Sequence, residues 1–272
     1  MKKLLAIALC ALMLFSAIFA LASCTQKEEK KLILGFDAEF PPYGYLDTET
    51  NTYVGFDLEL AAIVCKDLGY ELQLQPIDWD AKDNDLASGR INCIWNGFTM
   101  NGREEKYAFT EAYIDSSIVV LTKSDSGIAA LADLAGKKVS VQADSSGESA
   151  LAVSDDDDAE TKAAKQARLD SFKGGNYVTC PNYTVGFTDL ETGAIDALVI
   201  DKGVAVRLIE GKSGYTILSE AVNTEQYAVG FLLGEDALAK TFSDAIKAVD
   251  KETVFALADK YGIERGALLL WK

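Results

Sequence analysis

Residues 93–103 read Cys-Ile-Trp-Asn-Gly-Phe-Thr-Met-Asn-Gly-Arg, an apolar start followed by a turn of glycine, asparagine and threonine. The apolar start is typical of a buried strand, and the turn exposes backbone N–H groups and the Thr99 hydroxyl near the Arg103 guanidinium. A guanidinium is a planar donor that can hold both oxygens of a carboxylate, so this stretch suits a carboxylate ligand. The alternative for Arg103 is a surface ion pair with Glu104 or Glu111.

The residues before this stretch predict the fold class. Residues 32–36 are apolar and indicate a buried strand, 57–68 carry apolar residues at the spacing of one helix face, and 71–76 alternate like a strand. A short helix at 81–88 leads into a strand at 91–96. This β-α-β-α-β order predicts an α/β fold with mixed, mostly parallel sheets and helices on their faces. The segment at 37–45 is expected to be a loop.

A second α/β half follows. Strands are expected at 138–142 and 197–200, and helices at 159–172, 183–191, 202–210, 237–249 and 252–261. The strand-like runs at 116–122 and 226–233 carry the chain to this half and back. No Gly/Pro/Ser-rich linker separates the halves, so we expect two lobes joined by two strands. The acidic run at 155–158 lacks the pattern of a calcium loop and is expected to be a solvated helix start.

The N-terminus has the features of an export signal. Lys2 and Lys3 precede an uncharged apolar run at 4–22 that ends in small residues. Its last four residues, Leu21-Ala22-Ser23-Cys24, resemble the lipobox of bacterial lipoproteins, in which the chain is cut before the cysteine. The alternative is an uncleaved anchor helix.

The lipobox resemblance implies a lipoprotein signal peptide at 1–23 and a polar tether at 24–31. It also implies acylation of Cys24 by fatty acids such as palmitate, with anchoring to the outer, extracytoplasmic face of the cell membrane. Two or more acyl chains are enough for stable anchoring.

Composition excludes several functions. Without Lys2 and Lys3 the chain has 24 basic and 42 acidic residues, a formal charge of −18, which argues against a nucleic acid partner. The chain contains no histidine, so histidine-dependent catalytic triads and the commonest zinc ligand are excluded. We expect neither a metal nor a cofactor. Cys65, Cys93 and Cys180 are expected to be buried free thiols, with one disulfide as the open alternative.

Asp201 provides a second candidate binding group. It ends the apolar run at 197–200, and a carboxylate at the end of a strand suits an ammonium group. Together, Arg103 and Asp201 would hold a free amino acid by both of its charges.

Several motifs then fall in one order along the chain. They are Gly-Phe-Asp at 55–57, the segment from Arg103 to Tyr113, Asp-Leu-Ala-Gly-Lys at 133–137, Gly-Ala-Ile-Asp-Ala at 193–197 and Glu-Gln-Tyr-Ala-Val at 225–229. In this order they resemble the polar amino-acid family of extracellular amino-acid-binding proteins of ABC importers. The resemblance extends over nearly all of the chain after the tether.

This resemblance implies a two-lobe, type II periplasmic-binding fold with a two-strand hinge that closes on its ligand. Lobe 1 would comprise 32–117 and 226–272, and lobe 2 would comprise 118–225. The implied function is capture of a free L-amino acid, polar or cationic, by a monomeric protein that delivers it to an ABC permease. The positions that the resemblance assigns to the ligand are Asp37, Phe40, Trp79, Gly97, Thr99, Arg103, Ser145, Ser146 and Asp201.

The implied roles divide by the part of the ligand. Arg103, Thr99 and the Gly97 backbone would take the carboxylate and part of the ammonium, and Asp201 the ammonium from the other lobe. The serine turn at 145–146 would add N–H groups at a helix start.

For the ligand side chain, Phe40 and Trp79 would cover the stem and Asp37 would contact the tip. The alternatives are that both aromatics are core residues and that Asp37 caps a loop.

The chain departs from the family pattern at two places. Thr99 and Arg103 are one residue closer than usual, so the turn must differ. Asp144-Ser145 replaces the usual Gly-Thr, and because Asp144 would repel a carboxylate we expect it to point away. Gln142 and Ile200 fill positions where relatives can carry other polar groups. Asp57 is expected to cap the helix that it begins.

Two other functions remain open. One is an enzyme on the same fold, resembling a cyclohexadienyl dehydratase, which would need an acid–base group such as Glu39 beside Asp37. The other is a receptor sensor module, which would need a transmembrane helix and a cytoplasmic domain, and no second long apolar run is present.

Overall fold

A five-stranded sheet forms the centre of the first lobe. The computed structural model describes residues 30–272, and in it the strand order of this sheet is β5-β1-β6-β14-β7. The strands are β1 (Lys30–Phe36), β5 (Tyr70–Pro76), β6 (Cys93–Ile94), β7 (Tyr107–Phe109) and β14 (Gly230–Leu232). β1 and β6 are parallel, and β14 is antiparallel to both β6 and β7.

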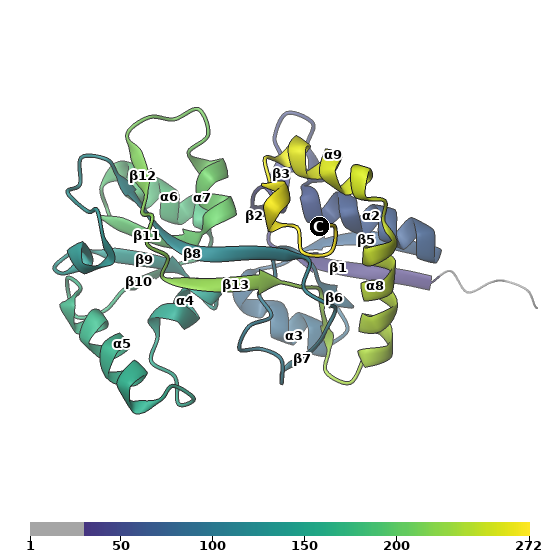
Figure 1. Cartoon of the computed structure of the whole chain (residues 1–272), viewed down its shortest axis with the longest axis horizontal. Helices are drawn as coiled ribbons and strands as arrows, with labels where there is room; N and C mark the ends of the chain where they lie inside the picture. The colour runs from purple at the N-terminus through teal and green to yellow at the C-terminus, as the bar shows by residue number, and fades with distance from the viewer. Residues whose placement is uncertain (1–29) are drawn as a thin grey trace, which may run out of the picture. The chain divides into compact units, whose positions relative to one another are not determined.

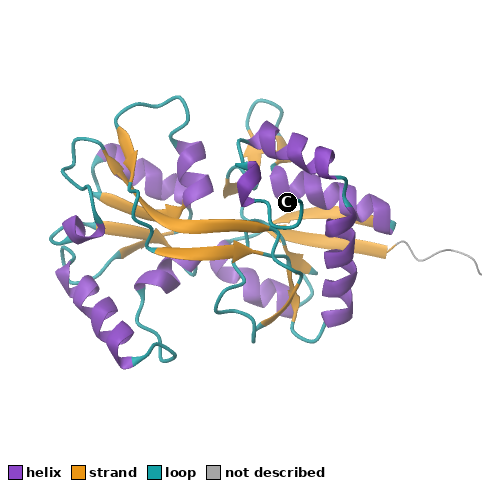
Figure 2. Ribbon diagram, viewed as in Figure 1, coloured by secondary structure: helices purple, strands orange, loops and turns teal. Residues whose placement is uncertain are grey.

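Helices cover this sheet (Figure 2). They are α2 (Phe56–Leu68), α3 (Lys82–Ala87), α8 (Asp236–Ala248) and α9 (Lys251–Tyr261), with short 3-10 turns η1 (Trp79–Ala81) and η3 (Arg265–Ala267). The start of α2 fits tightly against the preceding loop. Gly55 has a φ of 146°, and a Cβ there would lie 2.2 Å from the Tyr43 carbonyl oxygen, so only glycine is accommodated.

A small antiparallel sheet occupies the segment that the sequence analysis assigned to a loop. It consists of β2 (Glu39–Phe40), β3 (Gly44–Asp47) and β4 (Thr52–Val54). The loop prediction for 37–45 was therefore wrong over β2 and the start of β3. These strands are two to four residues long and include exposed positions, so their hydrophobic pattern is too short to indicate a strand.

The second lobe is built on a six-stranded sheet of order β10-β9-β11-β8-β12, with β13 also paired to β8. Its strands are β8 (Ile114–Lys123), β9 (Val139–Gln142), β10 (Val178–Cys180), β11 (Ala197–Asp201), β12 (Tyr215–Ile217) and β13 (Asn223–Tyr227). Its helices are α4 (Ser146–Leu151), α5 (Ala159–Ser171), α6 (Tyr183–Thr192) and α7 (Lys202–Leu208), with η2 (Leu131–Leu134). Asp158 caps α5, as expected of the acidic run.

Strands β8 and β13 connect the lobes side by side (Figure 1). They are antiparallel, in register from Ile114 opposite Tyr227 to Ile118 opposite Asn223. The predicted single strand at 226–233 was wrong, because the chain divides after Tyr227. β13 stays with β8, whereas β14 joins the first sheet between β6 and β7.

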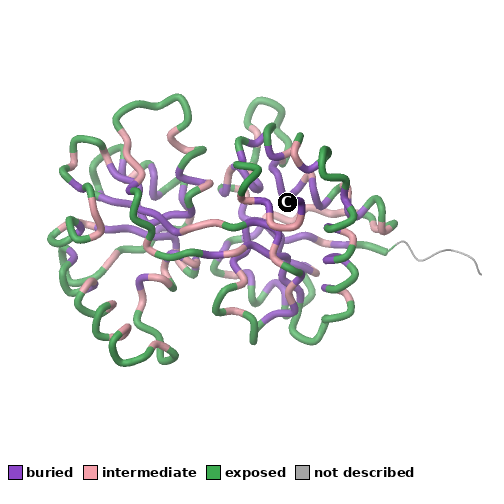
Figure 3. The backbone as a smooth tube through the Cα atoms, viewed as in Figure 1, coloured by how far each residue is buried: buried purple, intermediate pink, exposed green. Residues whose placement is uncertain are grey.

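Buried residues concentrate in the central strands of both lobes, and the outer helices carry the exposed ones (Figure 3). Cys65, Cys93 and Cys180 are buried and free, as the preferred interpretation expected. Among residues 30–272, no helix is long and apolar enough to cross a membrane. The signal peptide predicted at 1–23 and Cys24 lie outside the described residues.

Candidate functional site

The predicted site residues gather where strands of both lobes end. Asp37 follows β1, and the turn at 96–103 follows β6, which is parallel to β1. In the second lobe, Ser145 follows β9 and Asp201 ends β11, which is parallel to β9. The carboxyl ends of parallel strands are where ligands bind in open α/β sheets.

Asp37 links the two lobes. Its Oδ2 accepts a hydrogen bond of 2.8 Å from Nε2 of Gln142, and its Oδ1 accepts one of 2.8 Å from the Glu39 N–H. The second bond is a local loop contact, so Asp37 both closes a loop and faces the second lobe. Burial raises the pKa of Asp37 to about 6, with smaller contributions from the charges of Glu39 and Asp78.

An acidic cavity of about 540 Å³ opens beside Asp37. Four of its lining residues carry carboxyl groups, namely Asp37, Glu39, Asp78 and Asp80. The cation among its described lining residues, Arg90, already donates to both carboxylate oxygens of Asp85, at 3.0 and 2.9 Å. Residues of the second lobe, including Asn182, complete the wall. The cavity therefore has an excess of negative charge, which would stabilise a bound cation.

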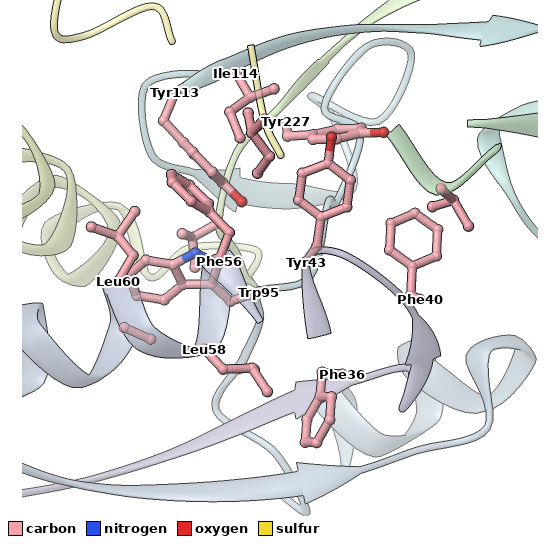
Figure 4. Close-up of a cluster of buried hydrophobic side chains, with 14 of the residues drawn as sticks. Phe36, Phe40, Tyr43, Phe56, Leu58, Leu60, Trp95, Tyr113, Ile114 and Tyr227 are labelled. Atoms are coloured by element: carbon pink, nitrogen blue, oxygen red, sulfur yellow. The ribbon is translucent and has the colours of Figure 1, made fainter. Parts of the chain in front are cut away.

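The two predicted aromatic residues differ in surroundings. Phe40 is buried, with its ring centroid 5.7 Å from that of Tyr43 and 5.9 Å from that of Tyr183 in the second lobe. Figure 4 shows Phe40 and Tyr43 on neighbouring positions of the same segment, with Tyr227 next to Tyr43. Trp79 lines the acidic cavity and packs edge-on against Phe98.

Gly97 holds the turn after β6 in place. Its N–H donates a 2.6 Å hydrogen bond to Oδ2 of Asp57, and a Cβ at Gly97 would lie 2.6 Å from Phe40. The Gly97 N–H is thus already hydrogen-bonded to Asp57, so Gly97 could contact a ligand only through its carbonyl. The prediction that Asp57 caps α2 was wrong. Gly55 precedes the helix instead, and loop carbonyls accept the first helical N–H groups, so the Asp57 carboxylate turns to Gly97.

Arg103 lies at the end of this turn. Its Nη1 donates a 3.2 Å hydrogen bond to the Thr99 carbonyl, and its guanidinium lies 5.0 Å from the Phe98 ring centroid. The surface alternative does not hold in this structure. Arg103 forms no ion pair with a carboxylate of the described chain, and Glu111 pairs with Lys247 instead.

Lys82 is a functional candidate that sequence reasoning missed. It is almost fully buried at the start of α3 and forms an ion pair with Asp144 of the second lobe. The same Nζ lies 3.2 Å from the Asp144 carbonyl. Asp144, expected to point away from the site, is thus directed toward Lys82. Nothing in the local pattern distinguishes this lysine from an exposed one, because its partner is 62 residues away.

The serine turn is already engaged within its own lobe. Ser145 caps α4, accepting a hydrogen bond from the Glu148 N–H at 3.1 Å and donating to the Gln142 carbonyl at 2.8 Å. Ser146 lies close enough to Glu225 to lower the pKa of that carboxyl group against the raising effect of burial.

Asp201 lies beside a second buried carboxyl group, Glu225 of β13. The Tyr227 hydroxyl lies 2.7 Å from Oδ1 of Asp201 and 3.1 Å from Oε1 of Glu225. The Thr99 hydroxyl donates to Oε2 of Glu225 at 2.5 Å. Burial raises the pKa of both carboxyl groups. Sequence reasoning included Glu225 in a motif but gave it no role, and it placed the strand only from residue 226 onward, whereas β13 begins at Asn223.

The structure thus separates the nine predicted residues into groups. Asp37 and Trp79 line the acidic cavity, Phe40 covers Gly97, and Thr99 meets Asp201 through Glu225 and Tyr227. Arg103 stands at the end of the first-lobe turn, and Ser145 and Ser146 stand at the start of α4 in the second lobe.

Comparison with known proteins gives a consistent result. Residues 32–264 match the family model of the bacterial extracellular solute-binding proteins, family 3. The L-cystine-binding protein TcyJ of Escherichia coli (strain K12) is 28% identical over 240 residues, covering 86% of this chain and 84% of the relative. The arginine-binding extracellular protein ArtP of Bacillus subtilis (strain 168) is 35% identical over 145 residues, covering 52% and 56%.

A solved structure is similar over a comparable length. It is an ABC uptake transporter substrate binding protein from Streptococcus pneumoniae with bound histidine. Its TM-score to this chain is 0.78 at 30% identity, covering 87% of this chain and 94% of that one.

The pKa of Asp37 predicts a pH-dependent effect of Asp37→Asn. The unfolded carboxyl ionises near 3.8 and the folded one near 6, so wild type loses stability as the pH rises between these values. At about 1.4 kcal/mol per pKa unit, the loss at pH 7 is about 3 kcal/mol. We expect Asp37→Asn to raise the free energy of unfolding at pH 7 by up to this amount, and to have little effect at pH 4, in urea titrations.

Asp47→Asn is the control. Backbone N–H groups lower the pKa of the partly exposed Asp47, so this variant should lose stability at pH 7 instead of gaining it. An Asp37→Asn variant that is equally destabilised at both pH values would contradict the argument.

Proposed function

The chain belongs to the bacterial extracellular solute-binding proteins, family 3, and we propose that it captures a free L-amino acid between its lobes for delivery to an ABC permease. The three similar proteins described above are named for, or contain, cystine, arginine and histidine. All three ligands share an α-carboxylate and an α-ammonium group, which the candidate site is equipped to bind separately.

One observation supports the proposal: the first lobe has a cation without an acidic partner among residues 30–272, and the second lobe has a buried carboxyl group at the end of β11. Arg103 has no carboxylate partner among residues 30–272 and would bind the ligand carboxylate, with help from the turn at 97–99. Asp201 would bind the ammonium group from the second lobe. Because the two partners belong to different lobes, binding favours lobe closure.

The ligand side chain would extend toward the acidic cavity. Asp37 and Trp79 line this cavity, and the three further carboxylates there favour a cationic or hydrogen-bond-donating tip. Arginine, lysine, glutamine and cystine meet this requirement. Aspartate and glutamate would bring another negative charge into a poorly screened space.

We propose binding without catalysis. The enzyme alternative would need an acid–base group next to Asp37, and Glu39 is the candidate in the same cavity. Glu39 is exposed to solvent, unlike the buried groups whose pKa values enzymes adjust for proton transfer. The family consists of solute-binding transport proteins.

A panel of amino acids tests the proposal. We expect the melting temperature of the purified protein to rise with arginine, lysine, glutamine or cystine, and least with aspartate and glutamate. Mass spectrometry of the released ligand should recover it unchanged. Strong stabilisation by glutamate would contradict the role of the acidic cavity, and chemical conversion of a ligand would favour the enzyme.

Arg103→Ala should remove most of the affinity while leaving the fold intact. Loss of one member of a buried charge pair costs about 2–5 kcal/mol, a factor of roughly 30 to several thousand in Kd. Calorimetry with the best ligand of the panel measures this change. Arg168→Ala, on α5, is the matched control and should bind like wild type. Binding by Arg103→Ala within threefold of wild type would remove Arg103 from the site.

The attachment of the protein is a further part of the proposal. The lipobox motif supports acylation of Cys24 and anchoring at the outer membrane face. We expect Cys24→Ala to lose the membrane fraction and the lipid mass seen for wild type. Cys10→Ala, within the apolar run, should retain both. A Cys24→Ala protein that is cut and anchored like wild type would contradict the lipobox interpretation.

A further inference from the structure

Asp201 and Glu225 form a buried pair of acidic side chains at the centre of the candidate site. Asp201 is 2% exposed and Glu225 3%, and both carboxyl groups lie within hydrogen-bonding distance of the Tyr227 hydroxyl, close enough to each other to share a proton. Two carboxylates in contact and out of water cannot both remain ionised. A hydrogen bond between them itself requires a proton on one of the two.

The groups that surround the pair supply hydroxyls and no cation. Tyr227 and Thr99 contact it directly, and Ser146 approaches from the start of α4. Tyr183 faces Asp201 from α6, and Tyr43 lies on the first-lobe side. Neither Asp201 nor Glu225 forms an ion pair with any lysine or arginine in the described part of the chain. The carboxyl oxygens of the pair can therefore accept further hydrogen bonds from a positively charged donor.

A second observation points to a ligand at the same place. The Tyr183 hydroxyl is fully buried next to Asp201, yet it forms no hydrogen bond of ordinary geometry in this structure. Tyr227 has one hydroxyl proton, which can serve only one of its two carboxyl neighbours at a time. A buried polar group without a partner is unfavourable unless something completes its contacts. An ammonium group has three N–H donors and a positive charge, which matches the unused acceptors.

We propose that Glu225 and Asp201 together hold the α-ammonium of the ligand, and that a proton takes its place when the cleft is empty. The inference rests on the proposed function, because it concerns how the same ligand is bound. On binding, the ammonium keeps its three protons and the proton of the carboxyl pair leaves to solvent. Affinity should therefore rise with pH, by about tenfold per pH unit where one full proton is released.

Calorimetry in paired buffers measures the released proton directly. L-Arginine, or L-cystine if it gives the larger stabilisation, is titrated at pH 7 in phosphate and in Tris, whose ionisation enthalpies differ. We expect wild type to release close to one proton per ligand. Glu225→Gln keeps the shape of the side chain but removes the shared proton. It should release close to none, and its Kd should depend much less on pH.

Glu160→Gln, on the exposed start of α5, is the control and should release the same number of protons as wild type. Binding by wild type without proton release would overturn this inference and leave the proposed function intact. Proton release that persists in Glu225→Gln would assign the proton to another group and overturn it as well. Absence of binding to wild type by every amino acid tested would overturn both.

Discussion

The antiparallel pairing of β8 with β13 is the constraint on which the site depends. Both connections between the lobes run through this one ribbon, five residues of which are paired on each side. The ribbon limits the lobes to bending about a common line. It also places Glu225 and Tyr227 between the lobes, because these two residues point to the same side of β13. In the proposed site, residues of the hinge would therefore also contact the ligand.

Side-chain contacts between the lobes add to this constraint. Gln142 donates to Asp37, Lys82 pairs with Asp144, and Tyr227 reaches Asp201. All three contacts bury an ionisable group that water would otherwise surround, and burial raises the pKa of Asp37 to about 6. Burial of an ionisable group is unfavourable by itself unless a partner of opposite charge or a hydrogen bond compensates it.

The sequence predicted the fold well because the hydrophobic residues of long helices and central strands recur at regular spacings. The two-lobe type II periplasmic-binding fold is confirmed by the solved structures that resemble this chain, and most central strands and long helices lie where periodicity placed them. The short strands β2 to β4 and the break between β13 and β14 escaped prediction, since pairing with distant partners decides them. The site shows the same limit. Arg103 closes a recognisable turn and Asp201 stands at a recognisable strand end, whereas the contacts of Lys82, Asp57 and Glu225 involve partners that are 40 to 126 residues away.

The free cysteines have a consequence for how the protein matures. A thiol reacts as its thiolate, and burial raises the pKa of Cys65 to about 11 and that of Cys93 well above its usual range. Cys180 is buried as well. Once folded, these thiols are protected from oxidants and from each other. The described part of the chain contains no disulfide that must form for it to reach this structure. The described part of the fold therefore contains no covalent cross-link that reducing surroundings would break.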